Sequence, residues 1–441
     1  MNNKNKIICH IDVNSAFLSW TAAYRVNVLG EKEDLRDIPS VICGNTESRH
    51  GIILAKSGPA KKYGIKTGEP LYQAMRKCPG LITAPPDYKL YVEASRKFIS
   101  LLKEVAPVVE QYSIDEAWID MTGTAGLYGP PVIAAEMIKN RIRDELGFTV
   151  NVGVSCNKLL AKMASDFEKP DKVHTLFPHE LSQKLWPLPI SELFMAGRAS
   201  CEKLKSIGIT TIGQLAAADP GQLKALLHKH GEQLWNFANG RWDEEVSDEH
   251  TLNKGYGNSM TTAVDITDMD SARRILLSLC ETVGMRIRKD GQTGRCISVS
   301  IRSSEFSNSS RQKQLAEPTD ATMEIYREAC DVLDKLWDKH TPLRQLGVYI
   351  SKTATEMDRQ TTIFQQDDYE KLSKADKTID EIRNRFGENA IIRASFLQSD
   401  VTPMGGGLSK ERRTGVAKSV EGEPSVDEIE RILQQKIKKD F

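Results

Sequence analysis

The sequence predicts a multidomain protein of the α+β class, and three observations indicate this. First, its 441 residues exceed the roughly 250–300 at which a single hydrophobic core stops growing. Second, the first 170 residues follow the order strand, helix, hairpin, helix, strand. Third, residues 185–240 have a helical pattern, whereas strands and helices alternate again over residues 254–355. Separate folding units are therefore expected along the chain.

The first of these units has a β-α-β-β-α-β pattern. Its expected elements are a strand at 7–12, a helix at 87–105, a hairpin at 108–121, a helix at 131–146, a strand at 149–154 and a helix that is capped by Ser155 and continues to residue 167. This pattern is typical of a ferredoxin-like fold, which by itself carries no function. Residues 20–80 interrupt it with two short strands and the start of a helix.

The remainder of the chain divides by composition. Residues 185–240 predict a compact set of short helices, and the charged and polar residues 241–253 predict a tether. In residues 254–355 we expect a second α+β domain, with helices at 271–289 and 319–339. A helix at 369–386 and a charged tail that we expect to be mostly disordered complete the chain.

Three carboxylates lie in or beside two of the predicted strands. Asp12 ends the first strand, and Asp115 and Glu116 are adjacent in the run Ser113-Ile114-Asp115-Glu116-Ala117. Neighbouring strand residues point to opposite faces, so this pair could share a site only at a bend or bulge. If the first strand pairs with the hairpin, Asp12 would join them and complete a site for two hard divalent cations. The alternative is a solvated Asp-Glu pair at a turn.

Three segments, in this order, carry a resemblance to a known family. They are Asp12-Val13 with Phe17 five residues after the Asp, the run 113–117, and Gly153-Val154-Ser155-Cys156-Asn157-Lys158-Leu159-Leu160-Ala161-Lys162 followed by Lys169-Pro170. Together they resemble the signatures of Y-family translesion DNA polymerases of the bacterial polymerase IV and polymerase V group. The likeness continues more weakly to about residue 355.

The resemblance implies a ferredoxin-like palm with a small fingers insert, a helix-hairpin-helix thumb and a separate α+β little-finger domain. The expected boundaries are 1–19 and 76–170 for the palm, 20–75 for the fingers, 171–240 for the thumb, 241–253 for a linker, 254–355 for the little finger and 356–441 for a C-terminal tail.

The resemblance also implies roles for the palm residues. Asp12, Asp115 and Glu116 would be the catalytic carboxylates and would hold two Mg²⁺, with the backbone carbonyl of Val13 as a further metal ligand. Phe17 would lie under the incoming sugar and collide with a 2′-hydroxyl; the alternative is an ordinary core phenylalanine.

Cations are expected around the triphosphate of the incoming nucleotide. By resemblance Lys169 contacts it, while Lys158 and Lys162, placed on the same helical stripe, either assist or form a solvated face. In the fingers the family has a Tyr and, three residues later, an Arg. Here Gly58 and Lys61 stand at those positions. The Tyr hydroxyl is therefore absent, and the bidentate guanidinium of the Arg is replaced by the single ammonium charge of Lys61.

Three further segments predict contacts with macromolecules. Gly197, at the start of a thumb helix, would grip a DNA phosphate in a helix-hairpin-helix, or belong to a plain helical hairpin. Residues 286–313 carry seven basic and two acidic side chains, which suit DNA phosphates or form an ordinary charged face. The candidate DNA contacts there are Arg286, Arg288, Arg302 and Arg311. Gln360, Ile363 and Phe364 resemble a sliding-clamp peptide.

Composition limits the remaining choices. Lys plus Arg equal Asp plus Glu at 60 each, so overall charge indicates no polyanionic partner. The eight cysteines form no CxxC pair, which favours a reducing compartment. The polar start Met1–Lys6 lacks the apolar core of a signal peptide, so none is expected, and no run approaches the roughly 20 apolar residues of a membrane span. We expect a cytoplasmic, nucleoid-associated monomer with primer-template DNA, dNTPs and a sliding clamp as partners and no membrane contact.

The resemblance implies a template-directed, low-fidelity DNA polymerase that performs translesion synthesis by two-metal-ion nucleotidyl transfer from dNTP to a primer 3′-hydroxyl. One alternative is a nucleotide cyclase, which also uses a ferredoxin-like palm with two metals. The thumb-like and little-finger-like segments disfavour it. The other alternative is a non-catalytic polymerase-like accessory factor in damage-induced mutagenesis, which the retention of all three carboxylates disfavours.

Overall fold

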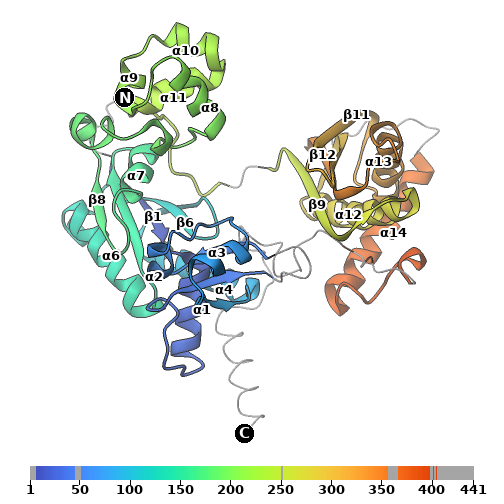
Figure 1. Ribbon diagram of the computed structural model, residues 1–441, viewed down its shortest axis with the longest axis horizontal. Coiled ribbons are helices and arrows are strands. Elements are labelled where there is room, and N and C mark those ends of the chain that lie inside the picture. The colour runs from blue at the N-terminus through green and yellow to red at the C-terminus, as the bar shows by residue number, and fades with distance from the viewer. Residues whose placement is uncertain are drawn as a thin grey trace. The chain divides into compact units, whose positions relative to one another are not determined.

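The computed structural model describes residues 6–44, 51–249, 252–355 and 366–397, together with Val401 and Met404 (Figure 1). The described parts of Met1–Asp34 and Asp87–Asp248 form one compact unit, and those of Leu35–Pro86 and Glu249–Arg413 form another. In the described part of the chain, no helix has the length and apolar character needed to cross a membrane.

The first unit is built on a five-stranded sheet with the order β5-β6-β1-β7-β8. Its strands are β1 (Ile8–Val13), β5 (Val108–Gln111), β6 (Glu116–Asp120), β7 (Val150–Ser155) and β8 (Val173–Thr175). β1 is central and pairs antiparallel with both β6 and β7, while β8 pairs parallel with β7 at the edge. The order of the first four strands is that of a ferredoxin-like sheet, which confirms the predicted fold class.

Helices cover both faces of this sheet, and the alternation along β1 assigns a face to each layer. α1 (Ala16–Asn27), α4 (Tyr88–Val105) and α6 (Pro131–Leu146) supply the apolar core on the face that contains Cys9, Ile11 and Val13. α7 (Lys158–Ser165) packs on the opposite face, where Ile8 is buried with Ala161. His10 and Asp12 alternate with the first set and therefore project toward α7. A short helix, α5 (Ala125–Tyr128), precedes α6.

The start of α7 differs from the prediction. Asn157, not Ser155, caps the helix, and its side-chain oxygen accepts a hydrogen bond from the Leu160 N–H at 2.9 Å. Ser155 is the last residue of β7, and its hydroxyl donates to the Leu176 carbonyl. The helix ends at Ser165 rather than at residue 167. Consequently, Lys169 does not share a helix with Lys158 and Lys162.

Gly153 lets α7 lie directly on β7. A Cβ at this position would stand 1.9 Å from the carbonyl oxygen of Ala161 and 2.4 Å from the backbone nitrogen of Ser165. Only glycine allows two backbones to approach so closely. The residue therefore fixes the distance between the helix and the sheet.

The segment of the same unit that was expected to form the thumb is mostly helical between residues 178 and 238, in agreement with its sequence pattern. Three single turns, η2 (Pro178–Glu180), η3 (Leu181–Leu185) and η4 (Ile190–Glu192), precede α8 (Arg198–Ser206), α9 (Ile212–Ala217), α10 (Pro220–Leu227) and α11 (Lys229–Ala238). Their buried side chains are mainly Leu and Ile and form one apolar cluster.

The charged segment after α11 differs from the expected tether. Trp242 packs edge-on against Trp118 with ring centroids 5.9 Å apart, and Val246 is buried in the cluster that contains Ile8. The Ser247 N–H donates to the Glu110 carboxylate at 3.0 Å. Residues through Asp248 thus belong to the first unit, so the first part of the expected linker is docked on the sheet.

The second unit contains two further sheets. Residues 35–86 form a three-stranded sheet with the order β3-β2-β4 and two short helices. These elements are β2 (Ser40–Cys43), β3 (Ile53–Lys56), α2 (Gly58–Lys62), α3 (Leu71–Lys77) and β4 (Ile82–Ala84). A small apolar cluster that includes Val41, Ile53 and Ala60 supports them.

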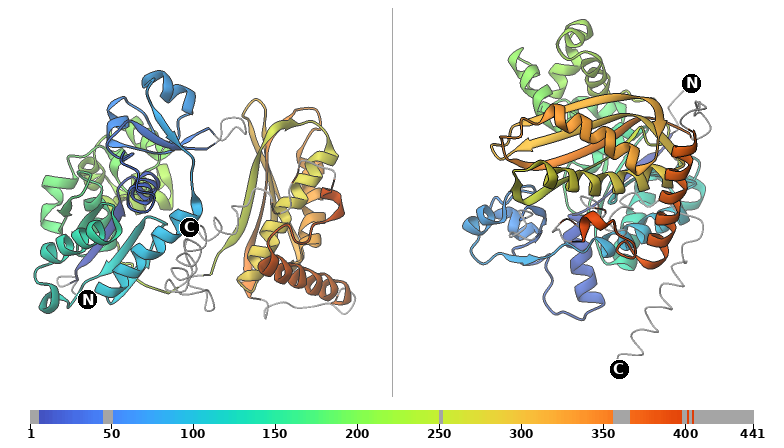
Figure 2. Two further views of the ribbon diagram at one scale, coloured as in Figure 1. Left: turned by 90° about the horizontal axis from the view of Figure 1, so that it is seen from below. Right: turned by 90° about the vertical axis from the view of Figure 1, so that its right-hand side faces the viewer.

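The other sheet is four-stranded and antiparallel, with the order β11-β10-β12-β9. Its strands are β9 (Gly255–Ile266), β10 (Gln292–Ser303), β11 (Asn308–Thr319) and β12 (Leu343–Thr355). α12 (Met269–Lys289) and α13 (Thr322–Leu336) cover one face of the sheet, and α14 (Gln366–Phe386) lies against these two helices (Figure 2). A single turn, η6 (Ala394–Phe396), follows.

Candidate active site

The pairing of β1 with β6 brings the predicted carboxylates together. Asp12 lies directly opposite Glu116, and the Val13 N–H donates to the Asp115 carbonyl at 3.0 Å. Opposite residues of an antiparallel pair have Cβ atoms about 4.5–5.5 Å apart and share a face of the sheet. Asp115 itself lies in the bend between β5 and β6. The convergence on which the metal-site prediction depends is therefore present.

Two lysines hold this group of carboxylates. The Lys162 ammonium lies 3.0 Å from Glu116 Oε2 and 3.2 Å from Asp12 Oδ2. The Lys169 ammonium lies 3.0 Å from the same Asp12 oxygen and 2.9 Å from Asp166 Oδ1. Lys162 reaches the carboxylates from α7, and Lys169 reaches them from the chain beyond that helix. Positive charge is thus concentrated at the position where a triphosphate is expected.

Lys158 does not join them, so the prediction of one lysine stripe is wrong. Its ammonium lies 2.7 Å from Glu110 and 4.8 Å from the centre of the Trp118 ring. The side chain is only 6% exposed, so it is not part of a solvated helix face either. Lys158 instead bridges the sheet and the docked segment, because its ammonium also lies 5.2 Å from the Trp242 ring.

The charges in the site act on one another. Burial raises the pKa of Asp115, and the charges of Glu116 and Asp12 raise it further, against the hydrogen bond from Ser113. Burial also raises the pKa of Glu116, but His10 and Lys162 outweigh it and bring that pKa down to about 2. For Lys162, burial lowers the pKa, and the charges of Asp12 and Glu116 raise it above its ordinary value. The carboxylates therefore repel one another and are held by cations.

Two residues that we did not predict complete the site. His10 is fully buried, with Nδ1 2.8 Å from Ser165 Oγ and Nε2 3.3 Å from Glu116 Oε2. Burial lowers the pKa of this histidine. A sequence signal for it exists, because His10 precedes Asp12 by two residues and must share its face of β1.

The donor set suits a hard divalent cation. Among the described residues, no three His, Cys, Asp or Glu side chains are arranged as a metal site. Three mutually repelling carboxylates are nevertheless the ligands that Mg²⁺ prefers alongside phosphates. Glu116 Oε2 is buried and has no hydrogen bond of good geometry, so it retains acceptor capacity. The Lys162 ammonium contacts both Asp12 and Glu116, so the space between these two carboxylates already favours a positive charge.

Phe17 is held rigidly near the start of α1. Its ring stacks on Tyr91 with centroids 4.3 Å apart and planes inclined by 5°, and it meets Tyr88 edge-on at 5.9 Å. The side chain is only partly buried. It therefore belongs to the rim of the core, and its contact with a nucleotide sugar stays a prediction.

Lys61 lies in the second unit. It is an exposed residue of α2, the helix that begins at Gly58 and is capped by Ser57. Burial lowers the pKa of Lys56, and the neighbouring charge of Lys61 lowers it further. These two lysines therefore form a local positive pair. The contact of Lys61 with a triphosphate stays a prediction.

The turn before α8 contains one residue in the left-handed region of φ. Gly197 is the N-cap of α8. Met195, which stands where that motif usually has its first glycine, has a φ of 64°, in the region that favours glycine. The chain thus keeps the turn without the usual residue. Contact of Gly197 with a DNA phosphate stays a prediction.

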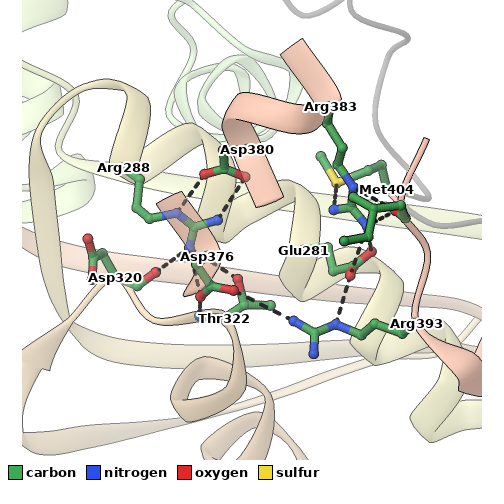
Figure 3. A network of polar contacts seen from close by, with 10 residues as sticks. Glu281, Arg288, Asp320, Thr322, Asp376, Asp380, Arg383, Arg393 and Met404 are labelled. Carbon is green, nitrogen blue, oxygen red and sulfur yellow. Dashed lines mark hydrogen bonds and ion pairs between the residues drawn. The ribbon is translucent and has the colours of Figure 1, made fainter. Parts of the chain in front are cut away.

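Arg288 has a buried side chain, in contrast to its predicted place on a DNA-binding surface. Its side chain is 5% exposed and lies 2.7 Å from Asp380 and 3.2 Å from Asp376, two residues of α14 (Figure 3). It also donates to the Asp320 carbonyl at 2.7 Å. A buried arginine that is already paired with two carboxylates is not available to a phosphate, so we remove it from the candidate DNA contacts. Sequence clustering of basic residues could not separate it from its exposed neighbours.

The other candidate arginines are partly or fully exposed. Arg286 donates to the Gly257 carbonyl at 3.0 Å, and Arg302 lies over the Phe306 ring at 4.9 Å. Arg311 is an exposed residue of β11. Their contacts with DNA stay predictions. The predicted clamp-binding residues Gln360, Ile363 and Phe364 lie outside the described residues.

Family comparisons agree with this arrangement. Family models described as the impB/mucB/samB family and its C-terminal domain match residues 11–166 and 253–363. The chain is 44% identical to DNA polymerase IV of Clostridium acetobutylicum over 90% of this chain and 99% of that protein. It is 35% identical to DNA polymerase IV 2 of Bacillus subtilis (strain 168) over 89% of this chain and 95% of that protein.

A solved structure is also similar. It is a Y-family DNA polymerase chimera, Dbh-Dpo4(243-245)-Dbh, with a TM-score of 0.66 and 24% sequence identity. The match covers 79% of this chain and 100% of the chimera. At this identity the likeness is one of fold.

Proposed function

The chain belongs to the impB/mucB/samB family and is a Y-family translesion DNA polymerase, and we propose that it works by two-metal-ion nucleotidyl transfer at Asp12, Asp115 and Glu116. As a DNA-directed DNA polymerase it acts on primer-template DNA and dNTPs. The observation that carries the proposal is the placement of Asp12 opposite Glu116, with Asp115 in the adjoining bend. Two Mg²⁺ ions bound there would lower the pKa of the primer 3′-hydroxyl and neutralise the leaving pyrophosphate.

The residues of the chain would supply position and charge. Lys169, whose ammonium lies 3.0 Å from Asp12, would orient the triphosphate beside the carboxylates. Lys162 would keep Asp12 and Glu116 at their present separation. Phe17, fixed by its stack on Tyr91, would exclude a 2′-hydroxyl. Positioning and electrostatic stabilisation provide most of the rate in phosphoryl transfer.

Several finer features belong to the same proposal. Low fidelity is supported by the family, and the surface arginines Arg286, Arg302 and Arg311, with the Gly197 turn, would bind the duplex through its phosphates. Lys61 would contact the triphosphate from the fingers. We also propose that the enzyme is a cytoplasmic, nucleoid-associated monomer that binds a sliding clamp through Gln360, Ile363 and Phe364.

Primer extension with Mg²⁺ tests the mechanism. We expect Asp115→Asn to lower kcat by at least about 100-fold, because it removes a charge that acts on the transition state. Binding of primer-template DNA should not change. The matched control is Asp144→Asn, which makes the same substitution at a carboxylate whose side chain is 65% exposed on α6, and it should extend primers normally.

Each alternative gives its own result. Undiminished extension by Asp115→Asn would show that the carboxylate assignment is wrong. Extension by neither the wild-type protein nor the variant would indicate the accessory role, and formation of a cyclic nucleotide from triphosphate alone would indicate the cyclase.

A further inference from the structure

We propose that His10 and Ser165 are positioning residues of the active site: a relay from the Ser165 hydroxyl through the His10 ring fixes the Glu116 carboxylate for metal binding. This inference rests on the proposed function, because it takes Glu116 as a metal ligand. His10 reaches no substrate position itself. It acts only through Glu116.

The geometry of the relay is continuous. Ser165 Oγ lies 2.8 Å from His10 Nδ1, and His10 Nε2 lies 3.3 Å from Glu116 Oε2. His10 is two residues before Asp12 and lies opposite Trp118 in the sheet register, which makes Glu116 its diagonal neighbour on the same face. The Trp118 ring meets the imidazole at 5.1 Å and 61°, so the ring plane is fixed by packing.

The hydrogen-bonding chemistry gives the relay a direction. The Ser165 hydroxyl has one proton and two possible acceptors, because its oxygen lies 2.8 Å from both His10 Nδ1 and the Lys162 carbonyl. When it donates to Nδ1, the ring carries its own proton on Nε2, the atom that faces the carboxylate. The opposite tautomer would point a lone pair at Glu116 Oε2, which is unfavourable between two buried acceptors. At 3.3 Å the contact is longer than a normal hydrogen bond, and neither atom has another hydrogen bond of good geometry. A small movement of Glu116 toward His10 would form it.

The relay and Lys162 act on the same oxygen. Lys162 Nζ also lies 3.0 Å from Glu116 Oε2, so both groups hold one side of the carboxylate. Replacing a residue that orients a metal ligand in this way usually lowers metal affinity or activity by about 10–100-fold. His10 and Ser165 are both fully buried, so water does not compete for these contacts.

Matched substitutions separate positioning from packing. The Gln side chain can place its amide nitrogen near the position of Nε2, whereas Asn can reach only that of Nδ1, and Phe keeps the ring without either nitrogen. We measure the dissociation constant of Mn²⁺, by electron paramagnetic resonance, from the complex with a dideoxy-terminated primer-template and the matching dNTP. No turnover occurs in this complex.

We expect His10→Phe and His10→Asn to raise the Mn²⁺ dissociation constant by about 10-fold or more, and His10→Gln to stay within a few-fold of wild type. Ser165→Ala should raise it in the same direction, and it guards against an unfolded His10 variant because it removes a single oxygen. Ile11→Val is the packing control: it alters a buried residue of the same strand on the opposite face and should leave Mn²⁺ binding unchanged.

The outcomes distinguish this inference from the proposed function. Wild-type Mn²⁺ affinity in His10→Phe and Ser165→Ala, with Glu116→Gln impaired, would overturn the relay alone. Equal losses in His10→Gln and His10→Asn would also overturn it, because packing would then explain both. Wild-type affinity in Glu116→Gln and Asp115→Asn would instead overturn the proposed metal site.

Discussion

Lys162 is the cation that contacts most of the acids around the carboxylate site. Lys162 contacts Asp12, Glu116 and Asp166, and its side chain is only 9% exposed. Buried charges are tolerated only when they are paired, and Lys162, together with Lys169, supplies the cations for these acids. In the proposed mechanism these carboxylates would also accept a divalent cation beside a triphosphate. Lysine suits this role because its charge sits on a flexible stem.

Phe17 gives the prediction at the scale of a residue. Replacing Phe17 with Ala should remove the obstacle to a 2′-hydroxyl and raise the incorporation of ribonucleotides relative to deoxyribonucleotides by about 100-fold, as expected for a loss of roughly 2–3 kcal/mol of steric discrimination. The measurement is kcat/KM for one matched pair of nucleotides. Leu18→Ala is the control, since it shortens a fully buried neighbour of Phe17. Unchanged sugar selection in Phe17→Ala would leave Phe17 as a plain core residue.

How far single residues can be predicted depends on whether their partners are near in sequence. Asp115 and Glu116 stand in one contiguous motif, and Asp12 could be added because a strand pairing was expected. His10 was missed, since a lone histidine in an apolar strand is most simply read as core. Lys158 pairs with Glu110 and Lys162 pairs with Glu116. Both acids lie far from the lysines in the chain, so the sequence alone does not show which partner each lysine takes.

At the scale of an element, α14 is fixed to its domain by buried ion pairs. Arg288 of α12 holds Asp376 and Asp380, and Glu281 of α12 accepts from Arg383 and Arg393 (Figure 3). The helix lies beyond the residues that the C-terminal family model matches. It nevertheless shares buried polar contacts with α12. The folded domain therefore extends past the predicted boundary at residue 355.

Replacing Arg288 tests this attachment. Arg288→Met should destabilise the domain by about 3–5 kcal/mol, because it breaks a buried charge network and leaves the Asp380 carboxylate without its ion-pair partner. Thermal unfolding measures the effect, and folded Arg288→Met should bind DNA like the wild type. Arg274→Met, on the same helix, is the control and should change stability little. Weaker DNA binding by folded Arg288→Met, with unchanged stability, would restore Arg288 to the DNA-binding surface.

Segments whose composition does not reveal where they pack were predicted less well. The elements predicted for the first unit lie within a few residues of their expected positions, since their apolar periodicity is strong. α1 was not predicted, because its residues from 20 onward were assigned to the insert. The segment after α11 is mostly charged and was read as a tether. Two apolar residues in it, Trp242 and Val246, are enough to dock it, because the Trp118 surface is present to receive them.

At the scale of the whole molecule, the net formal charge is zero. Attraction to DNA must therefore come from local surfaces, whose action is short-ranged at physiological salt. Arg288 shows that clustering in the sequence overestimates such a surface. The exposed Arg311 remains one of its candidates.

Salt dependence measures that surface directly. The logarithm of the DNA association constant should fall linearly with the logarithm of salt concentration, despite the zero net charge. Arg311→Met should reduce the steepness of that line by about one, and it should weaken binding to all sequences alike. Arg288→Met should leave the slope unchanged. A wild-type slope near zero would mean that phosphate contacts contribute little.

One consequence of Gly153 concerns the reaction itself. Because Gly153 has no side chain, the sheet that carries the acids lies in direct contact with the helix that carries Lys162 and Ser165. An alanine there would push the two apart by roughly 1 Å, and misalignment of that size can slow an enzyme by about 100-fold. We therefore expect the rate of this polymerase to depend on Gly153, although that residue takes no part in the chemistry.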